Sequence, residues 1–130
     1  RTAECAGVHA IVIPYRGAAQ INSDAVKTSG GALNIIPVCR EKNLSAAVDY
    51  LKESGLQIIA CTEKAKEDYF KTDFSTPTAI ILGSEEDGIS DDLLKKSDQK
   101  VCIPLSAKIE SLNVSVAAGI ILYEAVRQKN

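Results

Sequence analysis

Three loop segments of this sequence carry most of the side chains that could do chemistry. Leu82–Ser90 places three consecutive acids between two glycines, and Asn22–Leu33 is a Ser/Gly-rich turn that contains Lys27. Pro104–Ser115 offers hydroxyl and amide groups at Ser106, Ser111, Asn113 and Ser115. Each segment alone is typical of a solvated turn or a helix cap. Only the three together indicate a site.

The acidic loop limits the kind of ligand that such a site could take. Gly83 and Gly88 would let the backbone approach a ligand closely. The three carboxylates between them disfavour a phosphate cradle, which needs bare N–H groups and positive charge. They suit a ribose hydroxyl, a sulfonium, a divalent metal or water. From the residues alone, these possibilities stay open.

Strands and helices that alternate along the chain must position these loops. Apolar runs, mostly rich in β-branched residues, predict buried-type strands at Val8–Ile13, Leu56–Cys61, Thr78–Leu82 and Val101–Pro104. A further strand is predicted at Ile35–Cys39, short or peripheral because Pro37 interrupts it. Helices are predicted at Arg1–Ala6, Asp24–Thr28, Ser45–Glu53 and Asp91–Lys96, the last with Ser90 as its N-cap. Thr62–Pro77 is expected to be irregular and anchored by Tyr69, Phe70 and Phe74. This alternation predicts an α/β domain built around a parallel sheet.

A final helix, Asn113–Gln128, is apolar on nearly all of its faces. One stripe at helical spacing contains Val114, Ala117, Ala118, Ile121, Leu122 and Ala125, and Val116, Gly119, Ile120 and Val126 add small or apolar residues elsewhere. Such a helix must be covered on more than one side, so we expect a central core element or half of a subunit interface. It is too short and too interrupted to read as a membrane span.

The length and the net charge of the chain limit the functions that it could have. A chain of 130 residues suits one domain, and a net charge of -2 provides no general basic field for nucleic acid. There is no methionine and the chain starts with a helix-like segment, so we expect a fragment whose preceding strand is missing. No signal peptide or membrane segment is visible in the sequence.

The four cysteines and the single histidine give little sign of a metal site. Cys5, Cys39, Cys61 and Cys102 lack metal-type spacing, and three of them lie in strand-like runs. We expect buried free thiols in a reducing compartment. His9 stands alone and is interpreted as a structural or surface residue.

Considered together, three stretches resemble the motifs of the SpoU, or TrmH-like, family of SPOUT RNA methyltransferases. Residues 1–8 (RTAECAGV) are similar to the end of the first motif, residues 81–90 (ILGSEEDGIS) to the second, and residues 103–119 (IPLSAKIESLNVSVAAG) to the third. The resemblance covers nearly all of the chain. It implies an α/β fold, with a parallel sheet flanked by helices and a C-terminal trefoil knot. Residues 1–130 would then be a catalytic domain without its first strand and any N-terminal RNA-binding extension.

The resemblance also implies a cofactor and a reaction. S-adenosylmethionine would be held in the knot loops, largely by backbone groups, at Leu82, Gly83, Ser84, Ile103, Leu105, Ser111 and Leu112. Its methyl group would go to a ribose 2′-hydroxyl in rRNA or tRNA, with rRNA slightly favoured and no metal required. Catalytic roles would fall to Arg1, Glu85, Ser111 and Asn113. For Arg1 we favour positioning over base catalysis, because a guanidinium stays charged.

Further expectations follow from the same family. They are a homodimer built around the C-terminal helix, RNA as partner, a cytoplasmic location and no membrane attachment. The sequence departs from the family at Glu86 and Ala107, where relatives usually carry glycine, and Glu86 in particular would add bulk and charge beside the cofactor. Two alternatives remain. One is a non-catalytic module of the same fold that binds S-adenosylmethionine or RNA, and the other is an unrelated α/β nucleotide-binding enzyme with a metal at the acidic loop.

Overall fold

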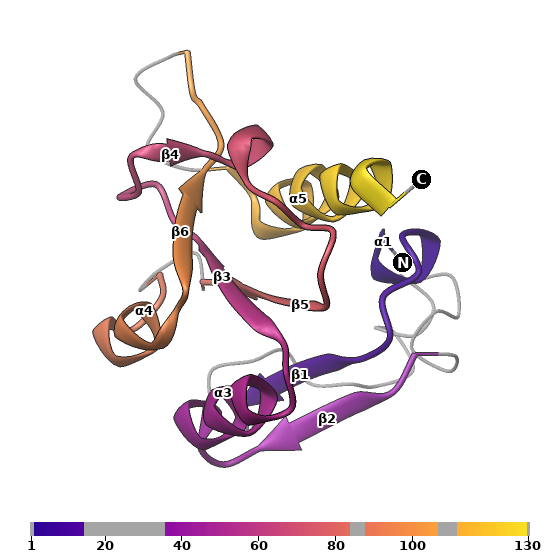
Figure 1. Ribbon diagram of the computed structural model, residues 1–130, viewed down its shortest axis with the longest axis vertical. Helices are drawn as coiled ribbons and strands as arrows, with labels where there is room; N and C mark the ends of the chain where they lie inside the picture. Colours follow the sequence, from indigo (N-terminus) through magenta and orange to yellow (C-terminus); the bar gives the residue numbers. More distant parts are fainter. Residues whose placement is uncertain (1, 15–35, 84–87, 107–111, 130) are drawn as a thin grey trace. The chain divides into compact units, whose positions relative to one another are not determined.

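The computed structural model describes residues 2–14, 36–83, 88–106 and 112–129 (Figure 1). The chain forms two compact units, Arg1–Leu44 and Ser45–Asn130, and each is described by itself. The first contains helix α1 (Thr2–Cys5) and a parallel pair of strands, β1 (Ile11–Pro14) and β2 (Val38–Glu41). The helix predicted at Asp24–Thr28 lies outside the described residues.

Both strands of the first unit begin three residues later than predicted. The N–H of Val8 donates to the carbonyl of Ala3 at 2.9 Å, and Gly7 has φ +75°. This is a Schellman ending of α1, so Val8 belongs to the helix terminus and not to the strand. Strand β2 begins directly after Pro37, which cannot donate to the ladder but accepts from the Ile11 N–H at 3.0 Å. In β1, the prediction of a buried strand is wrong at Val12, whose side chain is 39% exposed.

The second unit contains a four-stranded, wholly parallel sheet with the order β4-β6-β3-β5. Its strands are β3 (Gln57–Cys61), β4 (Glu67–Asp68), β5 (Thr78–Leu82) and β6 (Gln99–Cys102). The predictions for β3 and β5 are confirmed to within one residue. Strand β6 begins two residues before its predicted start, and the two-residue edge strand β4 was missed. The predicted α/β architecture with a parallel sheet is confirmed.

The helices of the second unit agree closely with prediction. They are α3 (Leu44–Glu53), α4 (Asp91–Lys96) and α5 (Val114–Lys129), with a 3-10 turn, η2 (Tyr69–Lys71), after β4. Helix α3 ends in a second Schellman motif, with the Leu56 N–H donating to the Leu51 carbonyl at 3.1 Å and Gly55 at φ +96°. No helix in the described ranges has the length and apolarity needed to cross a membrane.

The core of this unit is centred on β3. Ile58 and Ile59 are consecutive and both 0% exposed, so both faces of the strand are covered, because alternate side chains point to opposite faces. On one face Ile59 packs with Phe74, Val101 of β6 and Ile121 of α5. Phe74 is thus one of the anchors that the sequence predicted, and Tyr69, a second, packs against the same cluster. Phe70, predicted to be another anchor, is 48% exposed.

Helix α5 is only partly covered by this chain. Ile121 is 0% exposed and Ala125 packs against the same cluster. Val114, Val116 and Tyr123 are instead 37%, 51% and 47% exposed. A helix apolar all round therefore presents an apolar surface to solvent in the single chain.

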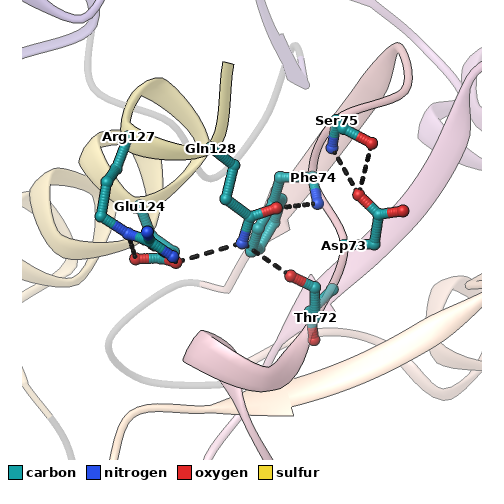
Figure 2. Close-up of polar contacts among 7 residues, drawn as sticks. All are labelled: Thr72, Asp73, Phe74, Ser75, Glu124, Arg127 and Gln128. Atoms are coloured by element: carbon teal, nitrogen blue, oxygen red, sulfur yellow. Dashed lines mark hydrogen bonds and ion pairs between the residues drawn. The ribbon is translucent and has the colours of Figure 1, made fainter. Parts of the chain in front are cut away.

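The last turn of α5 is fastened to the segment before β5 by a side-chain amide (Figure 2). Gln128 accepts from the Phe74 N–H at 2.6 Å and donates to the Thr72 carbonyl at 2.8 Å and to Glu124 at 3.1 Å. Arg127 forms an ion pair with the same Glu124 carboxylate at 2.6 Å. Thr72 and Phe74 are buried. The Gln128 amide thus satisfies two backbone groups that would otherwise need another partner.

The cysteines only partly follow prediction. Cys5 and Cys39 are exposed, so the expectation of burial is wrong for these two, whereas Cys61 and Cys102 are partly buried. All four are free thiols. His9 is exposed, as predicted for a surface residue.

Candidate functional site

Two of the three loops of the predicted site follow strands at the carboxyl end of the parallel sheet, and the third, Asn22–Leu33, lies outside the described residues. Cys61, the last residue of β3, is in register with Leu82 of β5 on one side and with Val101 of β6 on the other. The loops that follow β5 and β6 therefore start at one edge of the sheet and flank the end of β3. In open α/β sheets, this edge is where ligands bind.

After β5 the backbone makes an unusually close contact with itself. A Cβ placed on Gly83 would lie 2.5 Å from the carbonyl carbon of Gly88 and 2.7 Å from the Ile89 nitrogen. Gly88 itself has φ +68°, a conformation that glycine adopts without strain. The two glycines of the acidic loop are thus needed for different reasons. A side chain at Gly83 would collide with backbone, whereas Gly88 adopts a positive φ.

The segment after β6 is apolar where it meets the core. Ile103 is half-buried and packs against the cluster of Ile59, Phe74, Val101 and Ile121, whereas Leu105 is 36% exposed. Neither residue belongs to a helix or strand, and the same holds for Gly83 and Leu112. They lie just beyond the ends of the regular elements, where peptide groups can turn toward a ligand.

Asn113 begins α5 as an N-cap, as the sequence predicted. Its Oδ1 accepts from the Ser115 N–H at 2.8 Å, and its carbonyl accepts from the Ala117 N–H at 2.9 Å. The Oδ1 atom accepts in this cap, and the NH₂ group of the same side chain is a hydrogen-bond donor. The helix dipole adds a partial positive charge at the same end.

Several residues at this edge were missed by sequence reasoning. Thr62 follows β3 between the two loops and is 8% exposed; its N–H donates to the Val101 carbonyl at 2.9 Å, and its hydroxyl accepts from the Lys64 N–H at 3.3 Å. Cys102 places its Sγ 3.7 Å from Asp68 of β4. Only knowledge of the strand order, which the sequence does not contain, could have brought these residues to the site.

Both thiols at this edge are protonated near neutral pH. Burial raises the pKa of Cys61 to about 11, with smaller contributions from Cys102 and Glu63. Burial also raises the pKa of Cys102, and the Asp68 carboxylate adds to that shift. A thiol is a weak nucleophile compared with its thiolate, so neither Cys61 nor Cys102 is suited to act as a nucleophile here.

The structure therefore describes part of the predicted site. Leu82, Gly83, Ile103, Leu105, Leu112 and Asn113 lie at the strand ends or at the start of α5. Arg1, Ser84, Glu85 and Ser111 lie outside the described residues, as do Glu86 and Ala107. Among the described residues, no group of three or more His, Cys, Asp or Glu side chains could hold a metal ion.

A hollow of about 290 Å³ lies elsewhere in this unit. It is lined by Glu67, Lys71, Thr72, Gln99 and Lys100. Gln99 and Lys100 begin β6, whereas the predicted ligand loop follows its other end. The hollow is therefore not the site that the sequence motifs predict.

Comparison with known proteins defines the class of this chain. The model of the SpoU rRNA Methylase family matches residues 1–123. The chain belongs to this family of SPOUT methyltransferases, as its motifs indicated.

Particular relatives show how much of a whole enzyme is present. The 23S rRNA (guanosine-2′-O-)-methyltransferase RlmB of Escherichia coli is 35% identical over 130 residues, which are 100% of this chain and 54% of RlmB. The SpoU methyltransferase AviRb from Streptomyces viridochromogenes, solved with its cofactor AdoMet, is similar with TM-score 0.89 and 30% identity, over 98% of this chain and 53% of AviRb. The A. aeolicus TrmH/SpoU tRNA modifying enzyme gives TM-score 0.89 and 31% identity, over 98% and 65% of the two chains. The chain spans about half the length of the curated relatives that it matches first.

Proposed function

We propose that this chain is the catalytic domain of an S-adenosylmethionine-dependent RNA methyltransferase that acts on a ribose 2′-hydroxyl. The observation that carries the proposal is the family match over residues 1–123, which includes both loops at the carboxyl edge of the sheet. RlmB is named for this reaction on 23S rRNA, and AviRb was solved with AdoMet. An rRNA target is slightly favoured over tRNA.

The described part of the site suits this cofactor. Its lining combines half-buried apolar side chains with backbone just beyond the strand ends and before α5, at Gly83, Ile103 and Leu112. A neutral adenosine and a sulfonium can be held by such groups and need no cluster of cations. Leu82, Leu105, Ser84 and Ser111 complete the proposed binding set.

When bound, S-adenosylmethionine supplies an activated methyl group, so the protein has to align the acceptor oxygen and help its proton leave. Arg1 is proposed to hold the phosphate or hydroxyl region of the acceptor nucleotide. Glu85 and Asn113 would organise the acceptor site, with the Asn113 NH₂ as donor because its Oδ1 serves the helix cap. Ser111 would add a hydrogen bond beside the reacting groups. These steps use no metal.

The proposal includes a trefoil knot in the C-terminal part of the chain and a preceding segment at the N-terminus. Relatives about twice as long leave room for a first strand and an RNA-binding extension. Such an extension would supply RNA affinity that a chain with net charge -2 lacks.

We also propose a homodimer that buries the exposed side of α5. Val116 and Tyr123, seven residues apart on one face of the helix, are 51% and 47% exposed, and Val114 at its start is 37% exposed. Contiguous exposed apolar side chains are typical of interaction surfaces. Ile121 is not a suitable position for testing this dimer, because it is 0% exposed within the chain.

Methylation of RNA by the whole protein tests this function. Total RNA from a strain that lacks the gene should lose one 2′-O-methyl mark, and purified protein with S-adenosylmethionine should restore the mark in that RNA. The matched control is Asn113→Asp, which keeps the helix cap but removes the donor. Methylation on a base would contradict the proposal, and so would cofactor binding without methyl transfer to any RNA, which is the behaviour of a non-catalytic module.

A further inference from the structure

The contact of Gly83 with the backbone of Gly88 and Ile89, called the glycine contact below, joins two anchored parts of the fold. On one side, Gly83 directly follows β5, whose last residue, Leu82, is paired with Cys61 of β3. On the other side, Ile89 precedes Ser90, the N-cap of α4, whose Oγ accepts from the Leu93 N–H at 3.3 Å. Neither side can move freely to make room.

The distances show that only glycine fits at position 83 without rearrangement. A Cβ there would meet three backbone atoms of Gly88 and Ile89 at 2.5–2.7 Å. Cβ atoms essentially never come this close to other atoms, and backbone cannot rotate aside as the end of a side chain can. By contrast, a Cβ on Gly88 or on Gly55 would find nothing within 4 Å.

We propose that Gly83 is a positioning residue. Its bare α-carbon lets the Gly88–Ile89 backbone lie against the end of β5, and this contact fixes the orientation of the Leu82–Gly83 peptide before any ligand binds. The proposal rests on the proposed function, since that peptide belongs to the cofactor site suggested above. It differs from the sequence-based expectation, in which glycine was needed so that a ligand could approach.

The two explanations differ in what they require of the protein without ligand. If the glycine only makes room for the cofactor, Gly83→Ala leaves the ligand-free protein unchanged. If the glycine contact orders the strand end, the substitution disturbs the ligand-free protein as well. Overpacking against fixed backbone is destabilising, so we expect the melting temperature to fall by about 5 °C or more. Amide exchange at Gly88 and Ile89 should accelerate by about tenfold or more.

Cofactor affinity separates positioning from plain stability. The experiment uses the whole protein and measures melting temperature, amide exchange and S-adenosylmethionine affinity for wild type, Gly83→Ala and Gly55→Ala. Gly55 has φ +96° and lies at the end of α3, so alanine there adds conformational strain away from the proposed site. We expect Gly55→Ala to lower the melting temperature with affinity within about twofold of wild type. Gly83→Ala should weaken affinity by about tenfold or more, because misplaced binding groups lose their alignment.

The outcomes are distinguishable. Wild-type melting and exchange in ligand-free Gly83→Ala would overturn the inference. An intact affinity in a destabilised Gly83→Ala would also overturn it, because the contact would then be structural only. If Gly83→Ala does not fold, amide exchange of the ligand-free wild type provides the test: protection of Gly88 and Ile89 without ligand supports the inference, whereas protection that appears only with S-adenosylmethionine overturns it. Absence of binding by the wild type would instead count against the proposed function.

Discussion

The two ends of helix α5 are held in different ways. At its C-terminal end, the Gln128 amide bonds to both the Phe74 N–H and the Thr72 carbonyl, and Glu124 accepts from Gln128 and Arg127 (Figure 2). At its N-terminal end, Asn113 caps the helix, and the first turn leaves Val114 and Val116 37% and 51% exposed. The polar groups at the C-terminal end find their hydrogen-bond partners within the chain, whereas the N-terminal end presents apolar side chains to solvent.

This difference indicates that the two ends of α5 have different roles. The C-terminal end fixes α5 to the core through groups that need no ligand. The N-terminal end carries the Asn113 donor and the apolar surface that the proposed cofactor site and dimer would use. Substitutions at the C-terminal end should therefore change stability and not catalysis, and those at the N-terminal end should do the reverse.

The largest effect is expected at Asn113. Aspartate caps a helix as well as asparagine, so Asn113→Asp should change the free energy of unfolding by about 1 kcal/mol or less. It removes the NH₂ donor, so the rate of methyl transfer should fall by roughly a hundredfold or more. Initial rates, melting temperature and cofactor affinity, measured side by side, check this. Full activity would reduce Asn113 to a cap.

The opposite pattern is expected at Gln128. Gln128→Ala leaves the Phe74 N–H and the Thr72 carbonyl without this partner in a buried setting, which should cost about 2 kcal/mol of stability. Cofactor affinity should stay within about twofold of wild type, because the site lies at the other end of the helix. Arg127→Ala is the control, because it removes an ion pair whose arginine side chain is 68% exposed and should therefore lower stability much less than Gln128→Ala does. Denaturant titration measures both. Equal losses for the two variants would refute the anchoring role of Gln128.

A smaller effect concerns assembly. Val116→Glu places a charge on the exposed apolar side of α5 and should weaken the proposed dimer by about tenfold or more while the monomer stays folded. Lys129→Glu, at the exposed C-terminal end, serves as control and should leave the dimer intact. Sedimentation over a concentration series measures the dissociation constant. A wild-type protein that stays monomeric at high concentration would argue against the dimer.

The smallest effect is a pH dependence at the anchored end. Hydrogen bonds from Arg127 and then Gln128 lower the pKa of Glu124 from 4.5 to about 2. The folded state thus binds this proton less readily than the unfolded state, so the contribution of Glu124 is present above about pH 4.5 and is lost as the pH falls toward 2. Glu124→Gln should flatten the stability profile in this window. A stability profile identical to that of wild type would show that Glu124 does not contribute to the pH dependence.

Local signals in the sequence predicted much of this fold. The Ser90 cap, the helix predicted at Ser45–Glu53 and the apolar runs of β3 and β5 all depend on neighbours within a few residues, and each was placed to within a residue. The late start of β1 was missed because Val8 looks like strand but completes the Schellman ending at Gly7. The two-residue strand β4 has no periodicity of its own and exists through its pairing with β6.

The same distinction, between local signals and strand order, holds for the residues of the candidate site. Leu82, Gly83 and Asn113 were predictable because they stand in motifs at a strand end or a helix start. Thr62 and the Asp68–Cys102 contact were not, because they reach this edge only through the order β4-β6-β3-β5. The reason for Gly83 was also out of reach, since its contact with Gly88 and Ile89 is a matter of backbone approach.

The most direct test of the account is a calorimetric titration of the whole protein with S-adenosylmethionine in the presence of a chelator. The account predicts saturable binding of one cofactor per chain, retained in Gln128→Ala and independent of added divalent metal. Absence of detectable binding at millimolar cofactor, or binding that appears only when metal is added, would contradict it.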